Sequence, residues 1–121
     1  MKPSAEDTLE SVGRQLGVAF PVAAKLIGVH REQGIDDLVA AKVEMPATEW
    51  PGFLAKIPME RDLFSPGERG LLGPDDGFWD PHQAKGLRTA QALLPGRRTL
   101  NIGYHHGRGT AVVVYVVNHG T

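Results

Sequence analysis

The first apolar pattern in the chain has the spacing of an amphipathic helix. Leu9, Val12 and Leu16 recur every three or four residues, which places them on one helical face. Ser4 can cap the N-terminus of this helix, and Gly17 supplies a C-terminal stop. The pattern therefore predicts a helix between Ser4 and Gly17.

Residues 22–45 have the pattern of a β-hairpin. Apolar and polar residues alternate between residues 39 and 45, as in a strand with one buried face. Residues 22–31 fit either a strand or a helix that begins after Pro21. We favour the strand, because a tight turn and an alternating segment follow it.

The turn of this hairpin is expected at Gln33 and Gly34, since glycine adopts the backbone conformations that tight turns require. A hairpin centred there pairs Leu26 with Ala41. One face of the pair is then apolar throughout, which is what a sheet packed on a core requires.

A second helix is expected after Pro46, with Thr48 as its cap. Its apolar residues follow helical spacing at Trp50, Phe53, Leu54 and Ile57. Residues 59–78 have the glycine- and proline-rich composition of a loop, with one helical turn at residues 65–68, where a capping box begins. A further short helix, capped by Asp80, is expected to end near Gly86.

The C-terminal third predicts a three-stranded meander over residues 87–94, 99–105 and 110–118. Short connections at residues 95–98 and 107–108 contain the glycine, proline and arginine typical of turns. The last strand is apolar on both faces, so we expect it to lie centrally in the sheet.

Together these elements predict a single α+β domain spanning residues 1–121. Its order is an N-terminal helix, a β-hairpin, a helix, a long loop, a short helix and the meander. The expected architecture is an antiparallel sheet of about five strands with helices packed on one face. A chain of 121 residues is long enough to bury a core of this kind.

The charge is unevenly distributed along the chain. Residues 1–80 contain eight basic and 14 acidic residues, whereas residues 81–121 contain five basic residues, no acidic residue and four of the five histidines. The net charges of the two parts are −6 and +5. The basic residues of the second part fall mostly on predicted turns, so the split favours a charge-sorted surface over a nucleic-acid-binding tail.

Several classes of enzyme site are absent from the sequence. With no cysteine, the chain has no disulfide, thiolate metal ligand or thiol nucleophile. None of its three serines lies in a Gly-x-Ser-x-Gly motif. His105 and His106 are adjacent and should point to opposite faces of a strand, and His119 should lie near the far end of the same hairpin. We therefore expect no metal site and no cofactor.

An acid–base site without a metal stays open as an alternative. His105 could pair across the sheet with Arg88, or Asp80 could lie beside His82. A weak nucleic-acid-binding protein is the other alternative. Neither the acid–base site nor nucleic-acid binding is supported by a recognisable sequence motif; both rest only on the presence of suitable residues.

By elimination, the sequence favours a small non-enzymatic protein that binds another protein, such as an inhibitor or immunity-type protein. Two adjacent aromatic residues in a loop and the basic hairpin tips are the candidate contact surface. The candidate partner-binding residues are Phe78, Trp79, Asp80, His82, Arg97, Arg98, His105, His106 and Arg108. A homodimer is an alternative that applies if the last strand instead lies at an edge of the sheet and pairs with the same strand of a second chain.

The sequence predicts a soluble protein. The start of the chain contains no apolar segment of the kind found in signal peptides. The longest apolar run, residues 111–117, is far shorter than the roughly 20 residues that a membrane helix needs. A cytoplasmic protein fits, as does a periplasmic or secreted one whose signal peptide has been removed.

Overall fold

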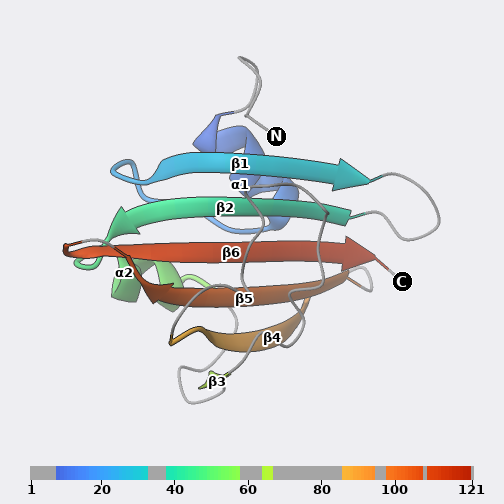
Figure 1. The fold of residues 1–121 in the computed structure, drawn as a ribbon. Helices are drawn as coiled ribbons and strands as arrows, with labels where there is room; N and C mark the ends of the chain where they lie inside the picture. The colour runs from blue at the N-terminus through green and yellow to red at the C-terminus, as the bar shows by residue number, and fades with distance from the viewer. Residues whose placement is uncertain are drawn as a thin grey trace.

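One antiparallel sheet with two short helices forms the described part of the protein. The computed structural model describes residues 8–32, 38–57, 64–66, 86–94, 98–107 and 109–120. Its elements are α1 (Leu9–Leu16), β1 (Lys25–Glu32), β2 (Leu38–Pro46), α2 (Trp50–Ala55), β3 (Ser65–Pro66), β4 (Arg88–Leu94), β5 (Arg98–His106) and β6 (Ala111–Gly120). The strands follow the order β1-β2-β6-β5-β4-β3 across the sheet (Figure 1). This arrangement confirms the α+β class, and the two-residue β3 adds a sixth strand to the five expected.

Both helices pack on the same face of the sheet (Figure 1). Their buried side chains join the central strands in one apolar cluster that includes Val12, Leu16, Val43, Met45, Phe53, Leu54, Leu100, Ile102, Val112, Val114 and Val116. Burying one aliphatic side chain of this kind contributes roughly 1.5–3 kcal/mol. A second, smaller cluster lies on the opposite face and comprises Ala40, Leu87, Val113, Tyr115 and Val117.

The last strand is central, as its apolar pattern predicts. β6 lies between β2 and β5 and pairs with both along its length. Its odd and even positions are buried in different clusters, which explains why it is apolar on both faces. Because both of its edges are already hydrogen-bonded, a homodimer through the edge of this strand is wrong.

The first helix begins later than predicted. Thr8 has an extended backbone and is the N-cap of α1: its Oγ1 accepts a hydrogen bond from the Ser11 amide at 3.0 Å. The Ser11 hydroxyl oxygen accepts in turn from the Thr8 amide at 3.0 Å, which completes a capping box. A helix continuous from Ser4 is therefore wrong, and Ser4 itself lies outside the described residues. The predicted stop is confirmed, since Gly17 has a left-handed φ of 80°.

The predicted hairpin forms, but its register is wrong. Residues 25–32 are a strand, which settles the choice between strand and helix, yet Leu26 pairs with Val43 and Ala41 pairs with Val29. An irregularity between Leu26 and Gly28 shifts the pairing by one residue. The turn predicted at residues 33–34 lies outside the described residues.

The second helix buries the predicted face but lacks the predicted cap. Phe53, Leu54 and Ile57 are buried, and Trp50 packs against them. The N-cap is Glu49, not Thr48, and no side chain hydrogen-bonds to the helix start. Pro51, which has no N–H, occupies the first turn, so one fewer amide there needs a partner.

Residues 65–66 form a strand where a helical turn is predicted. β3 pairs with the outer edge of β4, and the Arg88 guanidinium donates a hydrogen bond to the Phe64 carbonyl oxygen at 3.1 Å. The Phe64 ring is buried and packs edge-on against Tyr104, with 5.2 Å between ring centroids. These tertiary contacts outweigh the local helix signal. The short helix predicted after Asp80 lies outside the described residues.

Candidate functional site

Three of the nine predicted partner-binding residues are described by the structure. Arg98 begins β5, and His105 and His106 end it. At about 3.3 Å per residue, the two ends of this strand are separated by roughly 25 Å. The structure therefore does not bring Arg98 together with the two histidines. The other six, which are Phe78, Trp79, Asp80, His82, Arg97 and Arg108, lie outside the described residues.

Arg98 is held by a contact inside the protein. Its Nε donates a hydrogen bond to Asn118 Oδ1 at 2.6 Å. The Asn118 Nδ2 donates in turn to the carbonyl oxygen of Leu16, in the last turn of α1, at 2.7 Å. Asn118 is 3% exposed, so this relay joins β5, β6 and the C-terminus of α1 within the protein. A structural role accounts for these contacts of Arg98.

His105 packs against the sheet on the face opposite the helices. Its ring lies 6.0 Å from the buried Tyr115 ring, and its Nδ1 is 3.1 Å from the His106 carbonyl oxygen. Lys42 Nζ lies 5.3 Å from the centre of the same Tyr115 ring. The direct cross-strand partner of Arg88 is Tyr104, which comes immediately before His105 on β5. Because consecutive residues of a strand point to opposite faces of the sheet, Arg88 and His105 lie on different faces. The alternative acid–base pair of His105 with Arg88 is therefore wrong.

His119 lies at the other end of the β5–β6 hairpin, as the sequence predicts. It pairs with Thr99, and its Nε2 is 3.3 Å from Asn101 Nδ2. Asn101 Oδ1 accepts a further hydrogen bond from Gln91 Nε2 at 3.0 Å. Within the described ranges, no three histidine, aspartate or glutamate side chains come close enough to hold a metal ion.

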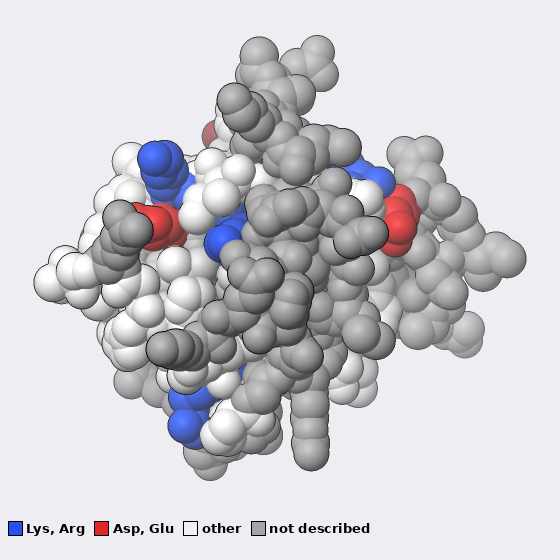
Figure 2. All heavy atoms as spheres, viewed as in Figure 1, with Lys and Arg blue, Asp and Glu red and all other residues white. Residues whose placement is uncertain are grey.

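Charges of opposite sign are mixed among the described residues on the face of the sheet opposite α1 and α2. Figure 2 shows acidic side chains of the described residues beside basic ones at both sides of this face. Lys25 and Glu44 are direct cross-strand partners on this face. Glu32 lies on the same face near the end of β1, with its carboxylate 3.6 Å from His30 Nε2, whereas Arg31 points to the helix side and donates a hydrogen bond to Gln15 of α1. The segregation of charge along the sequence therefore does not produce a patch of one sign over the described part of this face.

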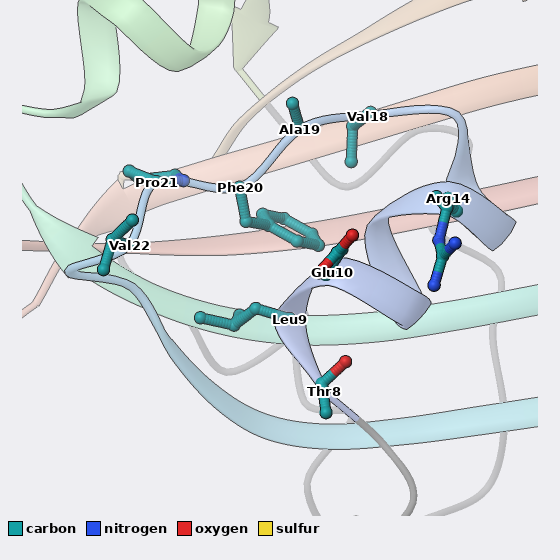
Figure 3. Close-up of a pocket in the computed structure, with 9 residues that line it drawn as sticks. All are labelled: Thr8, Leu9, Glu10, Arg14, Val18, Ala19, Phe20, Pro21 and Val22. Carbon is teal, nitrogen blue, oxygen red and sulfur yellow. The ribbon is translucent and has the colours of Figure 1, made fainter.

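An apolar groove lies between α1 and the segment that follows it (Figure 3). Its volume is about 470 Å³. Most of the lining is apolar and is contributed by Leu9, Val18, Ala19, Phe20, Pro21 and Val22, while Thr8, Glu10 and Arg14 add polar groups from α1. Val22 stands at one end with 99% of its side chain exposed.

A close approach of backbone to helix shapes this groove. The amides of Gly17 and Val18 both donate to the Gly13 carbonyl oxygen, so the chain reverses direction directly after α1. A Cβ atom at Gly13 would lie 2.7 Å from the Val18 carbonyl oxygen, so only glycine fits there. The Phe20 ring then extends toward the groove and stacks on Phe53 of α2 at a centroid distance of 5.4 Å.

The lining favours binding over chemistry. An apolar recess of this size can accept aliphatic or aromatic side chains from a ligand. The Thr8 hydroxyl already caps α1. The other two polar residues of the lining are Glu10 and Arg14, whose side chains extend from α1. Sequence reasoning missed this groove because Val22 was assigned to a strand. Gly17 and Pro21, which bracket the apolar residues 18–20, are the local signal that could have indicated a surface turn.

Among the described residues, no helix has the length and apolar character needed to cross a lipid bilayer. No protein-family model, curated protein or solved structure matches the chain.

Proposed function

We propose that this protein is a non-enzymatic domain that binds another protein through the groove beside α1. The observation that carries this proposal is an almost fully exposed valine at the end of an apolar recess. Exposed apolar side chains next to a concave apolar surface are typical of protein-interaction sites. Inhibition of an enzyme or neutralisation of a toxin is one form that such binding takes.

The polar groups around the groove support recognition of a protein surface. Glu10 and Arg14 flank the apolar lining, and a charged rim around an apolar centre is the usual organisation of a protein interface. The candidate residues at the end of β5 are separate from this groove. Their part in partner binding stays a prediction, as does that of the six residues outside the described ranges.

Replacing Val22 with serine is expected to reduce partner capture at least about tenfold, which corresponds to about 1.4 kcal/mol of binding free energy. The immobilised wild-type protein and the V22S variant are each incubated with a lysate of the native host, and captured proteins are quantified by mass spectrometry. Because the Val22 side chain is almost fully exposed, its replacement should leave stability within about 0.5 kcal/mol of the wild type.

Leu93→Ser is the matched control. Leu93 on β4 is the other large hydrophobic residue that is mostly exposed among the described residues, at 80%, and it does not line the groove. A protein captured by the wild type and by L93S but lost from V22S supports the proposal. Equal capture by all three proteins would show that the groove is not the docking surface.

A further inference from the structure

The outer side of α1 has one negative and one positive charge at a spacing of one helical turn. Glu10 and Arg14 are both exposed and both border the groove. Residues four apart on a helix lie on the same side, where an acidic and a basic side chain can pair. Within the described part of the chain, however, neither makes an ion pair or a side-chain hydrogen bond. Both charges are therefore available to a partner.

This charge pattern is complementary to itself. If two copies of α1 pack antiparallel about a two-fold axis, Glu10 of each copy lies opposite Arg14 of the other. A two-fold axis forms both pairs at once, because the same surface meets itself in an isologous interface. Opposite charges facing each other favour this register over a parallel one, in which like charges would meet.

The apolar groove fits the same arrangement. Its lining runs from Val22 at one end to Val18 at the other, alongside α1 (Figure 3). Reversing the direction of α1 also reverses the direction of the groove. The two-fold axis that pairs the charges therefore brings the exposed Val22 of each copy over the Val18 end of the groove of the other copy, where its apolar surface leaves water.

We propose that the groove beside α1 is a homodimer interface whose occupant is Val22 of a second copy of this chain. The inference rests on the proposed function, since it names the protein that the groove binds. The contact is confined to one short helix and the segment after it, so it belongs with the small interfaces that associate weakly and reversibly. Dimer formation should therefore depend on concentration, and the charge pairs should make it weaker at high salt.

A charge exchange tests the proposal. In the E10R variant both facing positions are basic, and in the R14E variant both are acidic, so each variant alone should dimerise at least about tenfold more weakly than the wild type. In an equimolar mixture, the arginine introduced at position 10 would face the glutamate introduced at position 14 of the other variant. The unchanged Arg14 of the first variant would face the unchanged Glu10 of the second. Both ion pairs are then restored, and the mixture should form a heterodimer with close to wild-type affinity.

Sedimentation velocity between about 1 μM and 1 mM protein measures association over the relevant range of dissociation constants. Native mass spectrometry separates the heterodimer from the two homodimers by mass. Circular dichroism confirms that each variant is folded. The V22S variant tests the contribution of the exposed apolar side chain at the groove, and the L93S variant is its control. V22S should dimerise at least about tenfold more weakly than the wild type, and L93S should not change.

The inference is overturned if the wild-type protein stays monomeric throughout this range, or if the charge variants associate alone as well as they do when mixed. The same measurements distinguish a failure of this inference from a failure of the proposed function. If the wild type is monomeric but V22S specifically loses a different captured protein, the groove still binds protein and only the identity of its partner is wrong. If V22S changes neither self-association nor capture, both proposals fail.

Discussion

Replacing Asn118 with leucine is expected to lower the free energy of unfolding by about 2–4 kcal/mol. The side chain is 3% exposed and makes two hydrogen bonds to segments far away in the sequence. It donates to the Leu16 carbonyl oxygen and accepts from the Arg98 guanidinium. Leucine has a similar size and can make neither bond, so a backbone carbonyl at the end of α1 loses its partner.

The loss is large because the affected groups are buried or half-buried. An acceptor left without a partner in the interior costs about 1–3 kcal/mol, and hydrogen bonds to charged groups are stronger than neutral ones. Urea denaturation followed by circular dichroism measures the change as a shift of the midpoint at constant slope.

Asn118→Asp is the matched variant that separates the two bonds. Aspartate keeps an acceptor for Arg98 but has no N–H for the Leu16 carbonyl oxygen. It should therefore be destabilised at the α1 contact, where a carboxylate oxygen faces the Leu16 carbonyl oxygen, while the Arg98 guanidinium offsets the cost of burying the new charge. If N118L unfolds at the same urea concentration as the wild type, the relay between α1, β5 and β6 does not contribute to stability.

Replacing Gly13 with alanine is expected to lower the free energy of unfolding by about 1–2 kcal/mol, although alanine is the better helix former by roughly 1 kcal/mol. The added Cβ would lie 2.7 Å from the Val18 carbonyl oxygen and 3.5 Å from the Phe20 ring. The segment after α1 must then move away from the helix. Because that segment forms one wall of the groove, the substitution should also weaken binding at the groove.

Gly52→Ala is the matched control, because the same change in α2 meets no obstacle. A Cβ at Gly52 would have no atom within 4 Å among its non-local neighbours, and the residue is exposed. This variant should gain about 0.5–1 kcal/mol from the higher helix propensity of alanine and the smaller entropy of its unfolded chain. Thermal and urea unfolding of both variants provide the comparison. Stabilisation of G13A to the same extent as G52A would contradict the close approach of residue 18 to the helix.

Local patterns predicted the elements but not all of their limits. The helical spacing of Val12 and Leu16, and of Phe53 and Leu54, identified the faces that the structure buries. The helix starts were less well predicted. Ser4 and Thr8 have similar capping ability, and sequence alone does not choose between them. The second helix begins after Glu49 with no side-chain cap, although Thr48 could have supplied one.

Hairpin register and the two-residue β3 depended on tertiary contacts. The register of β1 follows from an irregularity near Gly28 and from the pairing of β2 with β6 about 75 residues later. β3 forms because the Phe64 ring packs against the Trp50 and Tyr104 rings, which no local pattern near Ser65 indicates.

The candidate site shows the same division. Arg98 was selected from its charge and its position next to a predicted turn, yet its guanidinium bonds to a buried asparagine. The groove beside α1 went unnoticed because its walls meet only when the chain reverses at Gly17 and Phe20 stacks on Phe53. Neither outcome follows from the identity of the residues alone.

The sequence by itself determined the α+β class, the alternation of helices and strands, and the central place of a strand that is apolar on both faces. These properties follow from periodicity and local backbone preference, which act over a few residues. Only the tertiary structure decided the register, the relay that joins Leu16 to Asn118 and the groove at the end of α1. Each of these depends on side chains and backbone groups that folding brings together from distant parts of the chain, 102 residues apart in the case of that relay.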